Sequence, residues 1–292
     1  MQNDTPLAPR AAGKQSKLEG GNVNLQGIDW IQIIVLIALG LTVAFLCGVF
    51  RRKSIRVSQR HLADPRTPIE LLIPAFAGFC ASLFVPAVYF GIVVGQVHRQ
   101  PNSHQTVCMF AISAGAGLLV IQSMNLAQRT NLLRGSQLRS GLLVGLLGAL
   151  AVIPLVVAAT VVVQEIMRRS GAAAPQEHQL LIVFQQPSVL DRFLVILSAV
   201  ILAPMFEELT FRAHLQSAIR KATSMPWLSV LIASALFALA HSIWWMMPPL
   251  FVLAIGLGYV YERSRNIWAT ILMHSLFNAF SLAVEYISMK HH

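Results

Sequence analysis

Three groups of polar residues lie in the apolar back half of the chain and could together hydrolyse a bond with water. Glu207 and Glu208 stand side by side at the end of an apolar run. His241 lies in a later apolar segment, and the last such segment carries His274 and Asn278, four residues apart and so on one helical face. A carboxylate can take a proton from water, an imidazole can share it, and a second imidazole and an amide can donate hydrogen bonds to an oxyanion. These residue types together predict a water-activating hydrolase.

The two glutamates have different predicted tasks. Glu208 precedes Arg212 by four residues, and an acid N-terminal to a base at this spacing is the favourable order for a helical ion pair. Glu207 lies about 100° around the helix and lacks this partner. A carboxylate at membrane depth costs several kcal/mol unless it is paired or lines a wet cavity, which marks it as a functional residue. We therefore expect Glu208 and Arg212 to be structural and Glu207 to be a catalytic base.

Composition places the chain in a membrane. Of its 292 residues, 55% are hydrophobic and 12% are charged, whereas roughly 25% are charged in soluble proteins. The net charge of +10 could indicate nucleic-acid binding in a soluble protein. Here the basic residues are scattered through short loops without interleaved aromatic residues, which favours cytoplasmic loops that face anionic lipid. We expect the lipid bilayer as a partner and no nucleic acid.

Apolar segments long enough to span a bilayer, which needs about 20 residues, predict an all-α, polytopic helix bundle of about eight spans. The fifth and seventh segments look short for a complete span. The expected spans are 30–50, 71–95, 107–124, 141–163, 190–206, 227–245, 248–261 and 266–287.

The spans suggest four consecutive regions. Residues 1–27 are polar and predicted to be a disordered tail. Residues 28–163 hold the front four spans, which carry no ionisable residue at mid-span. Residues 164–189 form a polar, non-cytoplasmic loop, and residues 190–287 form a catalytic core of four spans.

Basic residues predict the orientation of the bundle. Of the 22 lysines and arginines, 14 fall on one side of the predicted spans and 8 on the other. The richer side is predicted to be cytoplasmic, which places both termini outside. The glutamates then lie toward the cytoplasmic side, and the polar cavity should open there. An integral, multi-pass protein of a bacterial cell membrane is the expected location.

The motifs Glu-Glu-x-x-x-Arg, Phe-x-x-x-His and His-x-x-x-Asn, in this order, resemble the CPBP family of intramembrane glutamic proteases. This family is also called the CAAX protease and bacteriocin-processing family, or Abi family, and includes Rce1-type CAAX prenyl endopeptidases. The resemblance covers about 95 residues of the back half. It implies an eight-helix α-bundle with a conical cavity open to the cytosol and to lipid.

The resemblance also implies a role for each motif residue. Glu207 would be the base that activates water, and His241 would be its partner. His274 and Asn278 would form the oxyanion hole. The supporting residues of the first motif would be Glu208 and Arg212. The substrate would be a membrane-associated peptide or protein, with prenylated CAAX tails, leader peptides and membrane-protein segments all open. No cofactor or metal is expected.

Two other interpretations remain open at this point. Zinc could be held by Glu207, His241 and His274, since two histidines and a carboxylate form a known catalytic zinc set, although the chain has no HExxH helix. A transporter or a non-proteolytic membrane scaffold is the other alternative, because polar residues inside a bundle also mark ion paths. An inverted repeat would favour a transporter, and none is visible.

The three cysteines, Cys47, Cys80 and Cys108, lie in apolar segments and have no metal-binding spacing. We expect them to be small buried thiols rather than a disulfide framework or a zinc site.

Overall fold

The computed structural model describes residues 30–46, 65–93, 102–171 except 129, 131 and 134, and 188–290. Within these ranges the chain forms helices and no strand, which confirms the all-α prediction. The tail predicted over 1–27 lies outside the described residues. So does most of the loop predicted over 164–189, although its first residues are helical because α4 continues to Arg169.

The front half contributes four α-helices and two short turns. Thr67 caps α2 through a capping box with Glu70, and Asn102 caps α3 in the same way. The elements are α1 (Trp30–Leu46), α2 (Pro68–Val88) with the π-helical turn η3 (Tyr89–Val93), α3 (Ser103–Ala127), the 3-10 turn η4 (Gly135–Gln137) and α4 (Leu138–Arg169).

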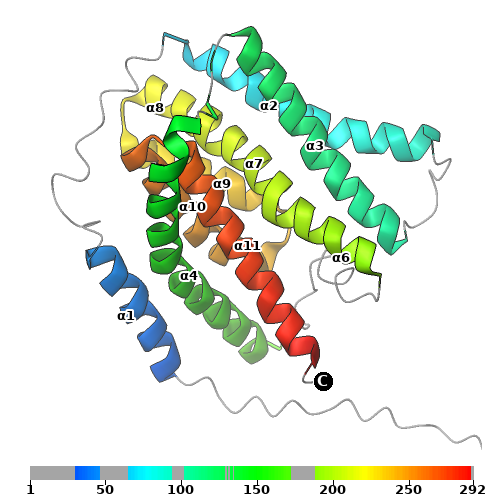
Figure 1. The fold of residues 1–292 in the computed structure, drawn as a ribbon. Helices are drawn as coiled ribbons and strands as arrows, with labels where there is room; N and C mark the ends of the chain where they lie inside the picture. Colours follow the sequence, from blue (N-terminus) through cyan, green and yellow to red (C-terminus); the bar gives the residue numbers. More distant parts are fainter. Residues whose placement is uncertain are drawn as a thin grey trace, which may run out of the picture.

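The back half begins with one continuous helix of 35 residues, Val189–Thr223, in which α-helical and π-helical stretches alternate. Its parts are α6 (Val189–Ile196), η5 (Leu197–Leu202), α7 (Ala203–Glu208), η6 (Leu209–Gln216) and α8 (Ser217–Thr223). In Figure 1 the labels α6, α7 and α8 follow one line across the molecule. The chain then forms α9 (Pro226–Ala240), the 3-10 turn η7 (Trp244–Met246), α10 (Met247–Ser264) and α11 (Ile267–Lys290).

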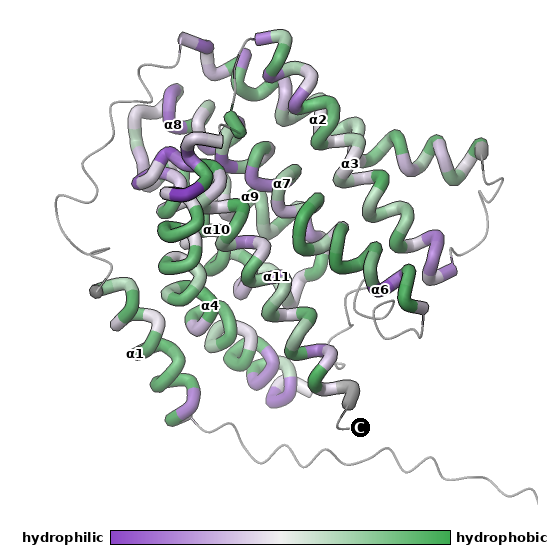
Figure 2. Tube along the Cα trace, in the orientation of Figure 1, coloured by the Kyte–Doolittle hydropathy of each residue, from purple (hydrophilic) through white to green (hydrophobic). Residues whose placement is uncertain are grey.

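Six of the described helices are long and apolar enough to cross a membrane, and two apolar helices, Trp30–Phe45 and Pro226–Ala240, are shorter. These features fit an integral, multi-pass membrane protein. Figure 2 shows hydrophobic residues along most of each helix and hydrophilic residues gathered around α8.

The prediction that the fifth and seventh apolar segments are short is wrong. The fifth lies in the 35-residue helix and the seventh in a helix of 21 residues, Trp244–Ser264, while the short helices are the first and the sixth. The fifth helix continues past Glu208 because this carboxylate and Arg212 pair inside the protein instead of ending the helix at the surface. Hydropathy therefore gave its end too early.

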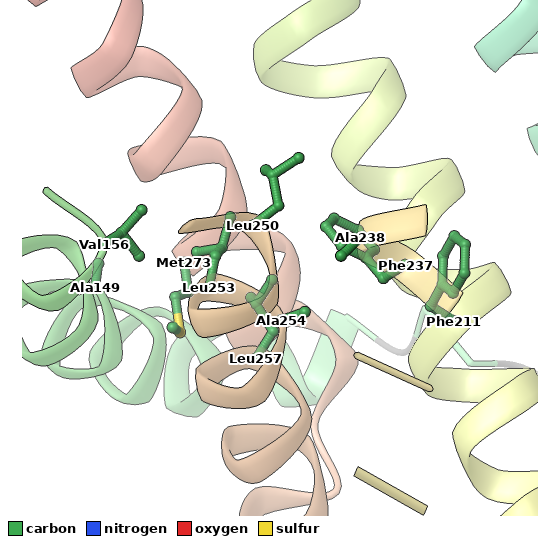
Figure 3. Packing of buried hydrophobic residues seen from close by; sticks show 10 residues of the cluster. All are labelled: Ala149, Val156, Phe211, Phe237, Ala238, Leu250, Leu253, Ala254, Leu257 and Met273. Carbon is green, nitrogen blue, oxygen red and sulfur yellow. The ribbon is translucent and has the colours of Figure 1, made fainter. Parts of the chain in front are cut away.

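The main hydrophobic core surrounds α10, which contacts α4, α9 and α11. Figure 3 shows Leu253 and Leu257 of α10 near Met273, while Phe237 and Phe211 lie on the opposite side of the view. Met273 and Phe237 are both fully buried. Met273 precedes His274 directly and Phe237 lies one turn before His241, so the core fixes the backbone that carries both imidazoles.

Candidate active site

Three separate elements bring the predicted catalytic side chains together. Glu207 comes from α7, His241 caps the C-terminus of α9, and His274 comes from α11. The Oε2 atom of Glu207 lies 3.9 Å from Nε2 of His241 and 3.9 Å from Nε2 of His274. The structure thus places one carboxylate oxygen against both imidazoles.

A backbone contact sets the tautomer of His241. Its Nδ1 lies 2.9 Å from the carbonyl oxygen of Phe237, and a carbonyl oxygen can only accept a hydrogen bond, so Nδ1 carries the hydrogen. The Phe237 carbonyl is available because α9 ends at Ala240, which leaves its last carbonyls without helical partners. In the neutral ring, Nε2 then has a free lone pair, and it faces Glu207.

A buried carboxylate orients His274. Nδ1 of His274 lies 2.9 Å from Oε1 of Glu208, and the two side chains are 4% and 0% exposed. The same Oε1 atom lies 3.1 Å from Nη1 of Arg212, so the ion pair that the spacing predicts is present. The contact between Glu208 and His274 was not predicted, because nothing in the sequence shows which face of α11 meets α7. It turns Nε2 of His274 toward Glu207.

Phe237 has a larger part in the site than its motif suggests. The guanidinium of Arg212 lies over its ring, 4.5 Å from the centroid, and a buried cation over an aromatic face is a favourable contact. The ring centroids of His241 and His274 lie 4.7 and 5.7 Å from that of Phe237. No role for Phe237 was predicted from the sequence, although its position four residues before His241 places both on one helical face.

Asn278 is one turn beyond His274 on α11, as the spacing predicts. The hydrogen bond that its side chain makes goes to another helical element rather than to the other site residues. Its Nδ2 donates to the backbone oxygen of Ala199, 2.6 Å away in the π-helical stretch η5. π-Helical turns widen a helix and are often found at functional sites. The sequence carries no signal that would have predicted these stretches on either side of α7.

Exposure separates the two glutamates. The side chains of Glu208 and Arg212 are 0% and 1% exposed, whereas those of Glu207 and His241 are 20% and 25% exposed. In the described part of the chain, Oε2 of Glu207 is itself buried and has no hydrogen-bond partner. A buried acceptor without a partner, in a residue that can be reached from outside, suits a group that binds a substrate or water.

The same three side chains can be tested as a zinc site. Zinc with nitrogen and oxygen bonds of about 2.0–2.1 Å in a tetrahedron holds its ligand atoms about 3.4 Å apart. The two carboxylate–imidazole distances here are 3.9 Å. Among the described residues, no group of three histidine, cysteine, aspartate or glutamate side chains is arranged to hold a metal ion. The observed geometry would have to contract to bind zinc.

Comparison with known families supports the resemblance noted from the motifs. Residues 189–280 match the family model described as type II CAAX prenyl endopeptidase Rce1-like. This range runs from α6 into α11 and contains all seven residues of the three motifs, so the resemblance to CAAX proteases is confirmed for the back half. No curated protein and no solved structure gives a match. The family match indicates a membrane-embedded protease.

Proposed function

We propose that the chain is an intramembrane endopeptidase in which Glu207 and two histidines activate water to hydrolyse a peptide bond. The observation that carries this proposal is the placement of Glu207 Oε2 at 3.9 Å from Nε2 of both His241 and His274. This distance is too long for a direct hydrogen bond. One water molecule hydrogen-bonded to the carboxylate and to an imidazole covers such a gap.

The proposed chemical step follows from the tautomer of His241. Because its Nδ1 hydrogen is donated to Phe237, its Nε2 can accept a hydrogen bond from the nucleophilic water and orient it. Glu207 takes a proton from that water as the oxygen attacks the carbonyl carbon of the substrate. The same carboxyl group then gives the proton to the leaving nitrogen, and the carbon–nitrogen bond breaks.

His274 and Asn278 are proposed to stabilise the oxyanion. Nδ1 of His274 donates to Glu208, and this contact keeps Nε2 of the ring directed toward Glu207, where the oxyanion of the substrate would form. The imidazolium form of the ring would donate a hydrogen bond to that oxyanion from Nε2. Asn278 has a second amide hydrogen besides the one that it donates to Ala199.

The proposed substrate is a membrane-associated peptide or protein, with a prenylated CAAX tail as the more specific hypothesis. The specific hypothesis is supported by the name of the matching family. The general one is supported by the place of Glu207 near the middle of the helix Val189–Thr223, which is apolar and long enough to cross a membrane. A lipid anchor would bring the scissile bond to the membrane.

The test uses the purified full-length protein and a pair of peptides that differ only in prenylation. We expect cleavage of the membrane-bound peptide by the wild type and loss of activity in Glu207→Gln and His241→Ala. Glu285→Gln is the matched control. It makes the same change at a carboxylate of α11 outside the site and should retain activity. Normal cleavage by Glu207→Gln would refute the proposal.

Two further measurements address the alternatives. Full activity of metal-free enzyme in chelator would exclude the zinc mechanism. If Glu207→Gln rescued a deletion phenotype as well as the wild type does, a scaffold or transport role would be favoured instead. Comparative proteomics of cells with wild-type and Glu207→Gln protein would identify the natural substrate as a peptide terminus that disappears.

A further inference from the structure

A second cluster of polar side chains joins the start of α3 to the start of α6. Nδ1 of His104 lies 2.6 Å from Oδ1 of Asp191. On the other side of the same ring, Nε2 lies 3.6 Å from Sγ of Cys108, which is within hydrogen-bond range for sulfur. A carboxylate, an imidazole and a thiol are therefore connected in series.

The direction of each hydrogen bond follows from the carboxylate. Ionised Asp191 can only accept, so Nδ1 of His104 carries a hydrogen, and in the neutral ring Nε2 then has the lone pair. The thiol of Cys108 then donates to Nε2, which makes His104 the base and Asp191 the group that orients it. This is the order of nucleophile, base and orienting acid that activates a thiol for attack.

The exposure of the side chains fits the roles of orienting acid, base and nucleophile. The side chain of Asp191 is 10% exposed, and the backbone nitrogen of Asp191 donates to Ser188 Oγ, 3.2 Å away in the cap of α6. The acid is therefore held in a fixed position. The side chain of His104 is 51% exposed and Cys108 is half-buried, so a reactant can reach both. Cys108 is half-buried, so the prediction of a small buried thiol is wrong for this residue.

This cluster is separate from the glutamate site. Asp191 and Glu207 lie in the same continuous helix, Val189–Thr223, 16 positions apart, which corresponds to roughly 24 Å along the axis at 1.5 Å per residue. No substrate atom could touch both groups at once. The simpler interpretation is an ion pair that only ties α3 to α6, and the experiment below distinguishes the two.

We propose that Cys108 is a base-activated nucleophile that accepts an acyl group from a thioester. The Sγ proton passes to Nε2 of His104 as Sγ attacks the carbonyl carbon. The bond from that carbon to the donor sulfur breaks, and the departing thiol takes the proton from Nε2. One thioester replaces another, so the exchange needs no oxidant or reductant.

The position of Cys108 favours an acyl group over a small polar one. It is the sixth residue of α3, a helix apolar and long enough to cross a membrane, which places it about 7.5 Å from the start of the helix. A long acyl chain on this sulfur could therefore extend into the bilayer beside the remaining turns of α3.

The first experiment measures the reactivity of Cys108 in full-length protein in which Cys47 and Cys80 are replaced by serine. Iodoacetamide is the probe, and glutathione at the same pH is the reference thiol. We expect His104→Ala, which removes the base, to lower the rate of Cys108 alkylation near neutral pH at least about tenfold. An unfolded protein would expose the thiol and react faster, so loss of the fold cannot imitate this result.

Two variants complete the comparison. Asp191→Asn should slow the alkylation and shift its pH profile, because the ring is no longer held in one tautomer. Gln105→Ala loosens the cap of α3 without touching the relay and should leave the rate within about twofold. Equal rates for wild type and His104→Ala would refute the proposal and leave only the ion pair that joins the helices.

The second experiment tests the acyl acceptor directly. The same protein is incubated with palmitoyl-coenzyme A, and mass spectrometry locates any adduct that hydroxylamine removes. An adduct at Cys108 that depends on His104 supports the proposal. A fast alkylation without any acyl adduct would overturn the assignment to thioesters.

Discussion

The two halves of the molecule fill their interiors with different residues. In the front half, helices approach through glycines: a Cβ at Gly40 would lie 2.7 Å from Cγ of Leu155, and one at Gly78 would lie 2.5 Å from Cγ1 of Ile121. In the back half, fully buried polar side chains follow one another along η6 and its neighbours. These side chains are Glu208, Arg212, His214 and Gln216. The first interior is typical of membrane helix packing, and the second is typical of a site.

The contrast holds even where the front half buries a charge. Glu165 lies in the last turns of α4 and pairs with Arg168 and Arg169, whose side chains are 46% and 61% exposed. Water therefore screens that cluster. The side chains of Glu208 and Arg212 are not in contact with water. Only contacts within the protein offset the free-energy cost of removing these two charges from water. A costly ion pair is retained where it orients His274.

Breaking that ion pair should give the largest effect. Arg212→Met leaves Glu208 buried without its cation, and we expect a loss of about 3–5 kcal/mol in the free energy of unfolding. Unfolding of the purified protein in detergent measures it. The double variant Glu208→Gln/Arg212→Met should recover part of the loss, since neither charge then stays uncompensated. Arg168→Met is the matched front-half control, and an equal loss there would contradict the comparison.

The second prediction tests whether the side-chain amide of Asn278, in the back half, takes part in catalysis or only in packing. Asn278→Ala should lower kcat by about 10²–10³ if its free amide hydrogen stabilises the oxyanion. It should lower the free energy of unfolding by only about 1 kcal/mol through the lost bond to Ala199. Ser281→Ala, which removes a hydrogen bond to Phe277 on the same helix, is the control and should leave kcat unchanged. A proportional loss of stability and activity would make Asn278 structural.

The sequence predicted much of the back half because its signals are local. Two polar residues four apart in an apolar segment share a face, which placed His274 with Asn278 and Glu208 with Arg212. The contact of Glu208 with His274 joins residues 66 positions apart, so periodicity could not reveal it. The π-helical stretches were missed because the sequence carries no signal for them. The true length of the fifth helix was missed because a buried ion pair looks like a helix end in hydropathy.

The front half was predicted less well for a related reason. Its spans were recognised from hydropathy, and three of the six described helices that are long and apolar enough to cross a membrane lie in this half. Which helices touch was not predictable, because glycine contacts depend on the exact approach of two backbones and leave no polar pattern in the sequence. The triad of His104, Cys108 and Asp191 was missed as well, since it joins α3 to α6 through one residue of the latter.

The third prediction addresses the glycine interior directly. Gly40→Ala places a methyl group 2.7 Å from Leu155 and 2.8 Å from the backbone oxygen of Ala151, so α1 must move away from α4. We expect a loss of about 1–3 kcal/mol, as overpacking usually costs. Activity per folded molecule should not change, because neither helix carries a site residue. A lower kcat in the folded fraction would show that the front half contributes to the site.

The smallest effect is expected at a front-half glycine that contacts nothing. A Cβ at Gly115 would meet no atom within 4 Å. Gly115→Ala should therefore keep the fold and raise the free energy of unfolding by about 0.5–1 kcal/mol, since alanine loses less backbone freedom in a helix. If Gly115→Ala is stabilising and Gly40→Ala is destabilising, the close approach of α1 and α4 explains the stability lost in Gly40→Ala, and the replacement of a glycine as such does not. A destabilising Gly115→Ala would instead indicate that this face of α3 contacts another helix or a second copy of the chain.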